Sequence, residues 1–192
     1  MTEWPFKVEH VRTRLAGLAP AHLVAFAATV SERLLPNYGA WSATSGWGDP
    51  KVLRTALDRI WAALQGAPLE TEEIHQLIEQ VDAVCPDSED FADCSAAIDA
   101  AAAVAASLEA RLDHTLDRAA GVGTTAGDTI DSAYQDDPAR MNARLEAELR
   151  QQEAEISLLR GVPQLSPALV AQLRQGATLG GGALLARAAE IA

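Results

Sequence analysis

The sequence predicts an all-α protein that forms a single compact bundle of about seven helices. Alanine, the best helix former, is heavily used, whereas β-branched residues are few and scattered. Almost every segment repeats its apolar residues at spacings of three and four, which place them on one helical face. With 192 residues, 48% hydrophobic and 22% charged, the chain suits one globular domain. We expect the bundle over residues 1–161, and over residues 162–192 a C-terminal helix and glycine-rich tail that packs on this domain or trails from it.

Proline, glycine and capping residues set the expected helix boundaries. Pro36 disfavours helical geometry in the residue before it, so the second helix should end there. Asp49 is expected as the N-cap of the third helix, with Pro50 at its first position, where a missing N–H costs nothing. Three glycines between residues 121 and 127 should end the long fifth helix. The expected helices cover residues 8–18, 21–35, 50–64, 71–84, 93–120, 128–135, 139–159 and 167–175.

The net charge of −12 and the isoelectric point near 4.6 argue against a nucleic-acid-binding protein, which would normally display a basic patch. The longest apolar run is too short and too polar to span a membrane. Residues 1–10 show no signal-peptide pattern, so we expect a cytoplasmic protein. Cys85 and Cys94 are expected to be free thiols.

No motif indicates catalysis, a metal or a cofactor. Glu72 and His75 form the only Glu-x-x-His pair, whereas a di-iron site in a helical bundle needs two such pairs and two more glutamates. The four histidines show no zinc-ligand spacing, and the glycine-rich residues 121–127 lack the lysine of a phosphate-binding loop. We therefore expect no catalytic residues, no metal and no cofactor.

Asp99 is the most informative carboxylate, because it lies between Ile98 and a run of alanines. If it is buried, it needs a partner. One interpretation is an ion pair with Arg33, Arg54 or Arg59. The alternatives are a ligand-binding acid and a solvated position.

Residues 36–50, PNYGAWSATSGWGDP, hold Tyr38, Trp41 and Trp47 in a chain with four Trp and two Tyr. We call this segment the elbow, because its proline and glycines should turn the chain between two core helices. Its aromatic side chains could bury a large area across the helix ends, as a structural plug, or could line the rim of a binding site.

The elbow also carries a family resemblance. Residues 31–64 resemble the signature of a bacterial family, the YjaG-like proteins of domain of unknown function 416. The matching elements of this first block are Glu32–Arg33, Pro36–Asn37–Tyr38, Gly46–Trp47–Gly48–Asp49 and Leu57–Asp58–Arg59–Ile60–Trp61. A second block matches at Pro86, Asp90–Phe91 and Ala97–Ile98–Asp99–Ala100, and a weaker third block spans residues 125–159. The resemblance covers residues 10–161 and implies an all-helical fold, with no established activity and no catalytic residues to transfer.

Two function classes follow. The first is a non-enzymatic protein that acts through a protein interface, either by self-association or in an adaptor or immunity-like role, with the narrow apolar stripe of residues 139–159 as one possible contact. The second is a helical protein that binds a small ligand or metal in a polar cleft formed by the elbow and Asp99. The candidate ligand or interface residues, which are polar or aromatic and come from the family-like blocks, are Glu32, Arg33, Asn37, Tyr38, Trp41, Trp47, Asp49 and Asp99.

Overall fold

The computed structural model describes residues 4–113 and 115–180. These residues form eight α-helices and no strand, which confirms the all-α class and is close to the expected count of about seven. The helices are α1 (Val8–Leu15), α2 (Pro20–Ser45), α3 (Pro50–Leu64), α4 (Thr71–Ala83), α5 (Ser95–Asp113), α6 (Leu116–Tyr134), α7 (Pro138–Arg160) and α8 (Pro167–Gly180).

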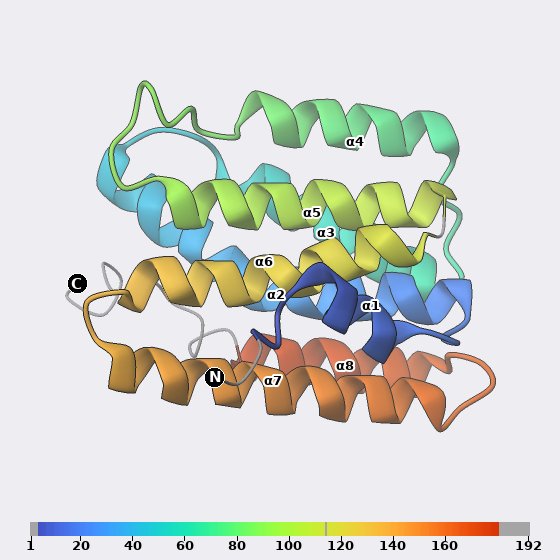
Figure 1. Cartoon of the computed structure of the whole chain (residues 1–192). Coiled ribbons are helices and arrows are strands. Elements are labelled where there is room, and N and C mark those ends of the chain that lie inside the picture. The colour runs from blue at the N-terminus through green and yellow to red at the C-terminus, as the bar shows by residue number, and fades with distance from the viewer. Residues whose placement is uncertain (1–3, 114, 181–192) are drawn as a thin grey trace.

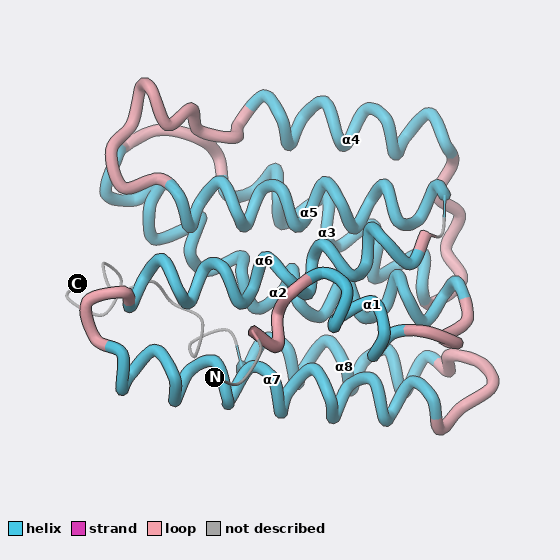
Figure 2. Tube along the Cα trace, in the orientation of Figure 1, coloured by secondary structure: helices cyan, strands magenta, loops and turns pink. Residues whose placement is uncertain are grey.

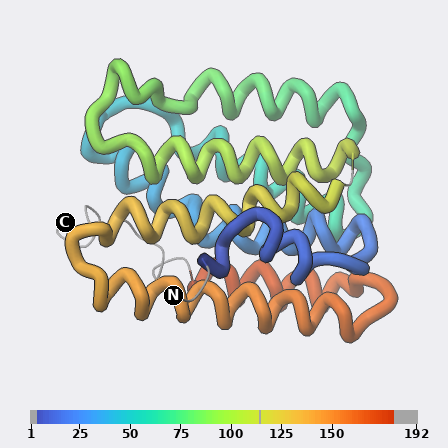
Figure 3. The backbone as a smooth tube through the Cα atoms, viewed as in Figure 1, coloured from blue at the N-terminus to red at the C-terminus, as the bar shows by residue number. Residues whose placement is uncertain are grey.

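From α2 onward the helices run back and forth, so their connections gather at two ends of the bundle (Figure 1 and Figure 2). The smooth trace in Figure 3 shows α4 as an outer helix on one side and α7 and α8 on the opposite side. The short α1 packs against α6, and α4 packs against α5 and α3. One end therefore holds the α2–α3, α4–α5 and α6–α7 connections, and the other holds the remaining turns.

Helix α2 is the centre of the fold. It contacts α3, α5, α6, α7 and α8, and every residue from 22 to 34 is buried. A helix buried on all sides shows little one-sided apolar pattern, because each of its faces meets another helix. Buried positions of α2 therefore include the charged residues Glu32 and Arg33, whose partners are described below.

The expected end of α2 at Pro36 is wrong, because the helix continues through this proline to Ser45. A proline inside a helix removes one hydrogen bond and costs about 3 kcal/mol. Here Pro36 itself is exposed, whereas Leu34, Tyr38 and Trp41 on either side are buried. Packing of both halves against the same core holds the helix together across the proline.

The expected long helix over residues 93–120, broken by glycines, is also wrong. α5 ends at Asp113, and α6 begins at Leu116 with the hydroxyl of Thr115 accepting a hydrogen bond from the N–H of Arg118 at 3.4 Å. The three glycines lie inside α6. A Cβ atom at Gly123 would lie 2.8 Å from Val11, and one at Gly127 would overlap the Phe6 ring. These two glycines allow the N-terminal segment to pack closely on α6.

The expected start of α3 is confirmed, whereas the short helix expected over residues 128–135 is part of α6. Asp49 caps α3 by accepting a hydrogen bond from the N–H of Lys51 at 2.9 Å, and Pro50 is its first residue. α8 continues to Gly180, beyond the expected end at residue 175, and packs on α2 and α3. The rest of the expected tail, residues 181–192, lies outside the described residues. The division at residue 161 stays a prediction. No helix in the described part of the chain is long and apolar enough to cross a bilayer.

The close packing of α6 gives a matched test. Gly127→Ala should lower the free energy of unfolding by about 1–3 kcal/mol, because the new methyl group must displace the buried Phe6 ring. Gly121→Ala, in the same helix with no atom within 4 Å of the new Cβ, should instead stabilise the protein by about 0.4–1 kcal/mol. Urea unfolding of both variants measures the difference, and an equal effect at the two positions would contradict this packing.

Candidate functional site

The aromatic cluster, defined as Tyr38, Trp41, Trp47 and Phe91, joins the elbow to the α4–α5 loop. The ring centroids of Trp41 and Phe91 lie 5.4 Å apart in an edge-to-face contact, and those of Trp47 and Phe91 lie 5.1 Å apart. Tyr38 and Trp41 are buried, but Trp47 keeps 36% of its surface exposed. The cluster therefore has a buried part that fills the helix ends and an outer ring that meets solvent, and a role as the rim of a binding site stays a prediction.

The turn that presents Trp47 is held by close backbone contacts. The Tyr38 hydroxyl donates a 2.6 Å hydrogen bond to the carbonyl of Val84, and the Ser42 hydroxyl donates one of 2.7 Å to the carbonyl of Trp47. Gly48 has φ +79°, and a Cβ there would overlap the Tyr38 hydroxyl, so the position requires glycine. Burial raises the pKa of Tyr38, which keeps this hydroxyl a donor.

Glu32 is buried on the side of α2 that faces α3 and α8. Its carboxylate accepts two hydrogen bonds from Arg54, at 2.5 and 2.9 Å, and one from the indole N–H of Trp61 at 2.8 Å. Arg174 of α8 lies 4.0 Å from the same carboxylate and also pairs with Asp58. Burial opposes the charge of Arg54, but its hydrogen bonds and attraction to Glu32 outweigh this and raise its pKa.

The Arg33 side chain has its partners on a different helix, α7. Only 1% exposed, it donates to Glu148 through Nε at 3.1 Å and Nη2 at 2.7 Å, and through Nη1 to Glu155. Gln152 donates to Glu148 at 2.9 Å and to the carbonyl of Gly123 at 3.0 Å, which extends the network to α6. Burial works against the charge of Arg33, yet the two carboxylates raise its pKa. Burial also raises the pKa of Glu155, and the attraction of Arg33 offsets this only in part.

Asp99 is half-buried between α5 and α6, and the Thr129 hydroxyl donates to its Oδ2 at 2.7 Å. The expected ion pair is not present: Arg33 pairs with α7, Arg54 with Glu32, and Arg59 with Glu73. Burial raises the pKa of Asp99 above its usual range, and the Thr129 hydrogen bond opposes this only in part.

The candidate residues are thus distributed over several parts of the fold. Glu32, Arg33 and Asp99 face different partner helices, Asp49 is an exposed cap and Asn37 is buried on α2. Four pockets of about 410, 350, 430 and 240 Å³ in the described chain are lined by other residues. No group of three or more metal-ligand side chains is close enough to hold a metal ion in the part of the chain described here.

A surface missed in the sequence analysis lies beside the aromatic cluster. Residues 60–110 contain eleven acidic residues and no Lys or Arg, whereas the rest of the chain contains sixteen acidic and fifteen basic residues. We define the acidic face as the exposed carboxylates that precede α4, lie on it or follow it in the α4–α5 loop: Glu70, Glu72, Glu79, Asp82, Asp87, Glu89, Asp90 and Asp93. None of these eight forms an ion pair within residues 4–113 and 115–180. A running charge sum along the sequence would have found this segment.

The chain resembles known proteins in sequence and in fold. The model of the family described as protein of unknown function (DUF416) matches residues 10–183, and so extends past Gly161 to include α8. Uncharacterized protein YjaG of Escherichia coli strain K12 is 32% identical over 81 residues, which are 42% of this chain and 41% of that protein's own length. A crystal structure of a DUF416 family protein from Shewanella baltica OS155 has a TM-score of 0.79 at 24% identity, covering 86% of this chain and 92% of that one, and shows the same fold.

Loss of the buried cation should be costly. Arg33→Met should lower the free energy of unfolding by about 3–5 kcal/mol, because Glu148 and Glu155 would stay buried without a counter-charge. Glu155→Gln should cost much less, since it keeps a hydrogen-bonding side chain and removes the excess negative charge. Arg150→Met, at an exposed pair with Glu146 on the same helix α7, should change stability by at most about 0.5 kcal/mol. Denaturant unfolding gives all three values, and similar losses for Arg33→Met and Arg150→Met would show that the network does not hold α7.

The raised pKa of Asp99 predicts a pH effect with a definite sign. The folded chain keeps this proton at pH values where the unfolded chain has lost it, so the contribution of Asp99 to stability falls as pH rises from about 4 through the folded-state pKa. Asp99→Asn should therefore raise the melting temperature more at about pH 7 than at about pH 4. Glu146→Gln, at an exposed position of α7, is the control. Equal changes for Asp99→Asn at both pH values would contradict the prediction.

Proposed function

Because the chain belongs to the DUF416 family of proteins of unknown function, its role has to be inferred from its own surface, and we propose that it acts by binding another protein. The proposed contact surface combines the acidic face with the exposed part of the aromatic cluster. The proposed partner carries a surface rich in Lys and Arg. The exposed Trp47 beside a row of unpaired carboxylates is the observation that supports the proposal most directly.

The charge of this surface favours a basic partner. Its carboxylates lie on an outer helix and the loop that follows it, where a partner has access (Figure 1). Opposite charges on two surfaces speed their encounter and disfavour wrong partners, although exposed pairs contribute little to affinity one by one. The acidic face would therefore select and orient the partner, while most of the binding energy would come from a smaller apolar contact.

Trp47 and Phe91 supply that apolar contact. Tryptophan is enriched among the few interface residues that contribute most of the binding energy. The Trp47 ring is fixed by Trp41 and Phe91, so little conformational freedom is lost when a partner covers it. A Lys or Arg of the partner could also lie on the face of this ring, where a cation is attracted by the π-electrons.

Self-association, which the sequence analysis also allowed, is less well supported. Two copies of the acidic face would repel each other. The apolar stripe of α7 is occupied within the fold, since Leu145, Ile156 and Leu159 are buried. An adaptor or immunity-like role in the cytoplasm remains one form of the proposal. The alternative of a ligand-binding cleft formed by the elbow and Asp99 gains no support from the pockets named above, because none of them is lined by these residues.

Binding experiments with matched variants test the proposal. Wild-type protein would be used to isolate a partner from its host, and the purified pair would then be measured by calorimetry at several salt concentrations. Trp47→Ala should weaken binding about 30-fold, which corresponds to about 2 kcal/mol. The double variant Glu89→Lys, Asp90→Lys should reduce the salt dependence of the affinity, because six carboxylates of the acidic face remain. Leu158→Ala and Glu146→Lys, both at exposed positions of α7, should bind like the wild type.

Three results would overturn the proposal. A partner bound equally well by the Trp47 and Glu89 variants would place the interface elsewhere. A wild-type protein that retains no partner even at low salt would remove the support for any such interface. Light scattering that shows a dimer, dissociated by Trp47→Ala, would make this surface a contact between two copies of the chain.

A further inference from the structure

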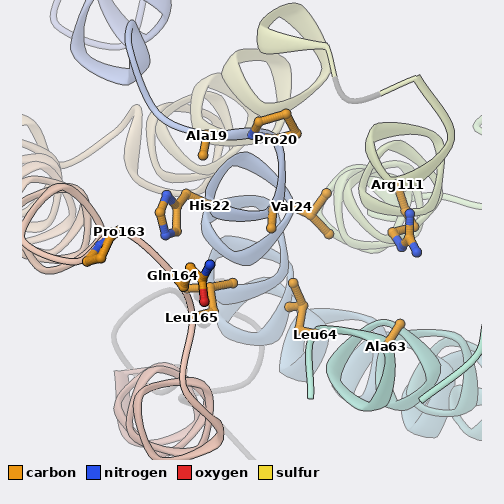
Figure 4. Close-up of a pocket in the computed structure, with 11 residues that line it drawn as sticks. Ala19, Pro20, His22, Val24, Ala63, Leu64, Arg111, Pro163, Gln164 and Leu165 are labelled. Carbon is orange, nitrogen blue, oxygen red and sulfur yellow. The ribbon is translucent and has the colours of Figure 1, made fainter. Parts of the chain in front are cut away.

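A second candidate site lies at the other end of α2. There a pocket of about 410 Å³ opens between the N-terminal end of α2, the C-terminal ends of α3 and α5, and the α7–α8 loop (Figure 4). Its apolar wall includes Val24, Leu64 and Leu165. This volume is in the range of pockets that bind small molecules. A helix rises 1.5 Å per residue, so the 26 residues of α2 span about 39 Å, and this pocket lies at the end of α2 that is far from Trp47.

His22 is the most unusual residue of the pocket. Its side chain is part of the lining, yet only 5% of the residue is exposed, and its buried Nε2 atom has no hydrogen-bond partner in the described chain. A second hollow of about 240 Å³ shares Ala19, His22 and Pro163 with the first, so the imidazole lies between two open spaces. Buried polar atoms are almost always paired, so an unpaired one beside a cavity calls for a partner such as a water molecule or a ligand.

The backbone adds hydrogen-bond donors to the same pocket. Helix α2 begins after Ala19, which offers no side-chain cap, and continues with Pro20, which has no N–H. The N–H of Ala21 makes no backbone hydrogen bond within the described residues. The positive end of the α2 dipole, where the helix has no side-chain cap, thus faces the pocket. This arrangement favours a negatively charged group there.

The charged and polar side chains of the pocket are also available. Figure 4 shows Arg111 on the opposite side of the α2 end from His22, with Gln164 on the His22 side. Neither Arg111 nor Gln164 forms a hydrogen bond or ion pair with the rest of the described chain. No acidic residue lines either hollow, although acidic residues outnumber basic ones by 27 to 15 in the chain. The pocket is therefore an exception to the negative character of the protein.

We propose that this pocket binds a small organic acid with one carboxylate and a compact apolar body. The carboxylate would pair with Arg111, and the apolar body would contact Val24, Leu64 and Leu165. The positive end of the α2 dipole, at the N–H of Ala21, would add to the attraction for this charge. One guanidinium with neutral donors suits a single negative charge better than the two charges of a phosphate group, which sets the ligand class. The site is independent of the protein interface proposed above.

Titration with defined probes tests this site. Acetate, hexanoate, benzoate and phenylacetate would be added to the full chain, with hexanamide and phenylacetamide as neutral controls and inorganic phosphate as a different anion. Binding would be followed by the imidazole NMR signals, in which His22 should shift and the exposed His75 should not. At least one larger carboxylate should bind with a dissociation constant below about 10 mM and at least tenfold more tightly than its amide.

Variants separate the proposed contacts from general effects. Arg111→Gln should weaken the carboxylate at least fivefold and bring its affinity near that of the amide, while Arg150→Gln on the exposed face of α7 should not change it. Leu64→Phe, which fills the pocket, should weaken acid and amide alike. If no carboxylate binds, if acid and amide bind equally, or if Arg111→Gln leaves the affinity unchanged, the proposal is wrong. None of these results depends on the partner-binding experiments.

Discussion

The fold depends on two neighbouring charges in the middle of its central helix. Glu32 and Arg33 both lie in the fully buried part of α2, and consecutive residues on a helix point about 100° apart. They cannot neutralise each other face to face, so each needs a partner from a different side. Arg54 and Arg174 meet Glu32 from α3 and α8, and Glu148 and Glu155 meet Arg33 from α7.

The need to pair both charges fixes the positions of the neighbouring helices, which apolar contacts alone would leave adjustable. The Arg33–Glu148 pair is bidentate, so it sets both the height and the rotation of α7 against α2. Buried ion pairs contribute little net stability, because desolvation offsets most of their attraction, but they disfavour any packing that leaves a charge without its partner. Small residues fix the packing of another helix. Gly123 and Gly127 allow the N-terminal segment to pack against α6, and the carbonyl of Gly123 joins the Arg33 network through Gln152.

Local rules predicted the features whose causes are local. Helical periodicity gave the fold class, and the Asp49–Pro50 start of α3 followed from capping chemistry. The errors came where packing outweighed local preference. Pro36 lies inside α2 because the residues around it are buried by other helices, and Gly123 and Gly127 of α6 leave room for Val11 and Phe6, which lie more than a hundred positions away in the sequence. The pairing of Arg33 with α7 instead of Asp99 also depends on topology, which one sequence without its fold does not reveal.

The repulsion between the carboxylates of the acidic face bears on the function of this surface. Outside residues 60–110 acidic and basic residues are almost equal in number, so the net charge of the protein comes almost entirely from α4, α5 and their loops. Crowded like charges destabilise a compact fold through repulsion. Here Glu73 pairs with Arg59, but the eight residues of the acidic face have no such partner in the described chain. Because α4 packs through Ile74, Leu77 and Val81, its exposed side could carry lysines without loss of these core contacts. That the surface retains this repulsion next to an exposed tryptophan supports the external partner that we propose for it.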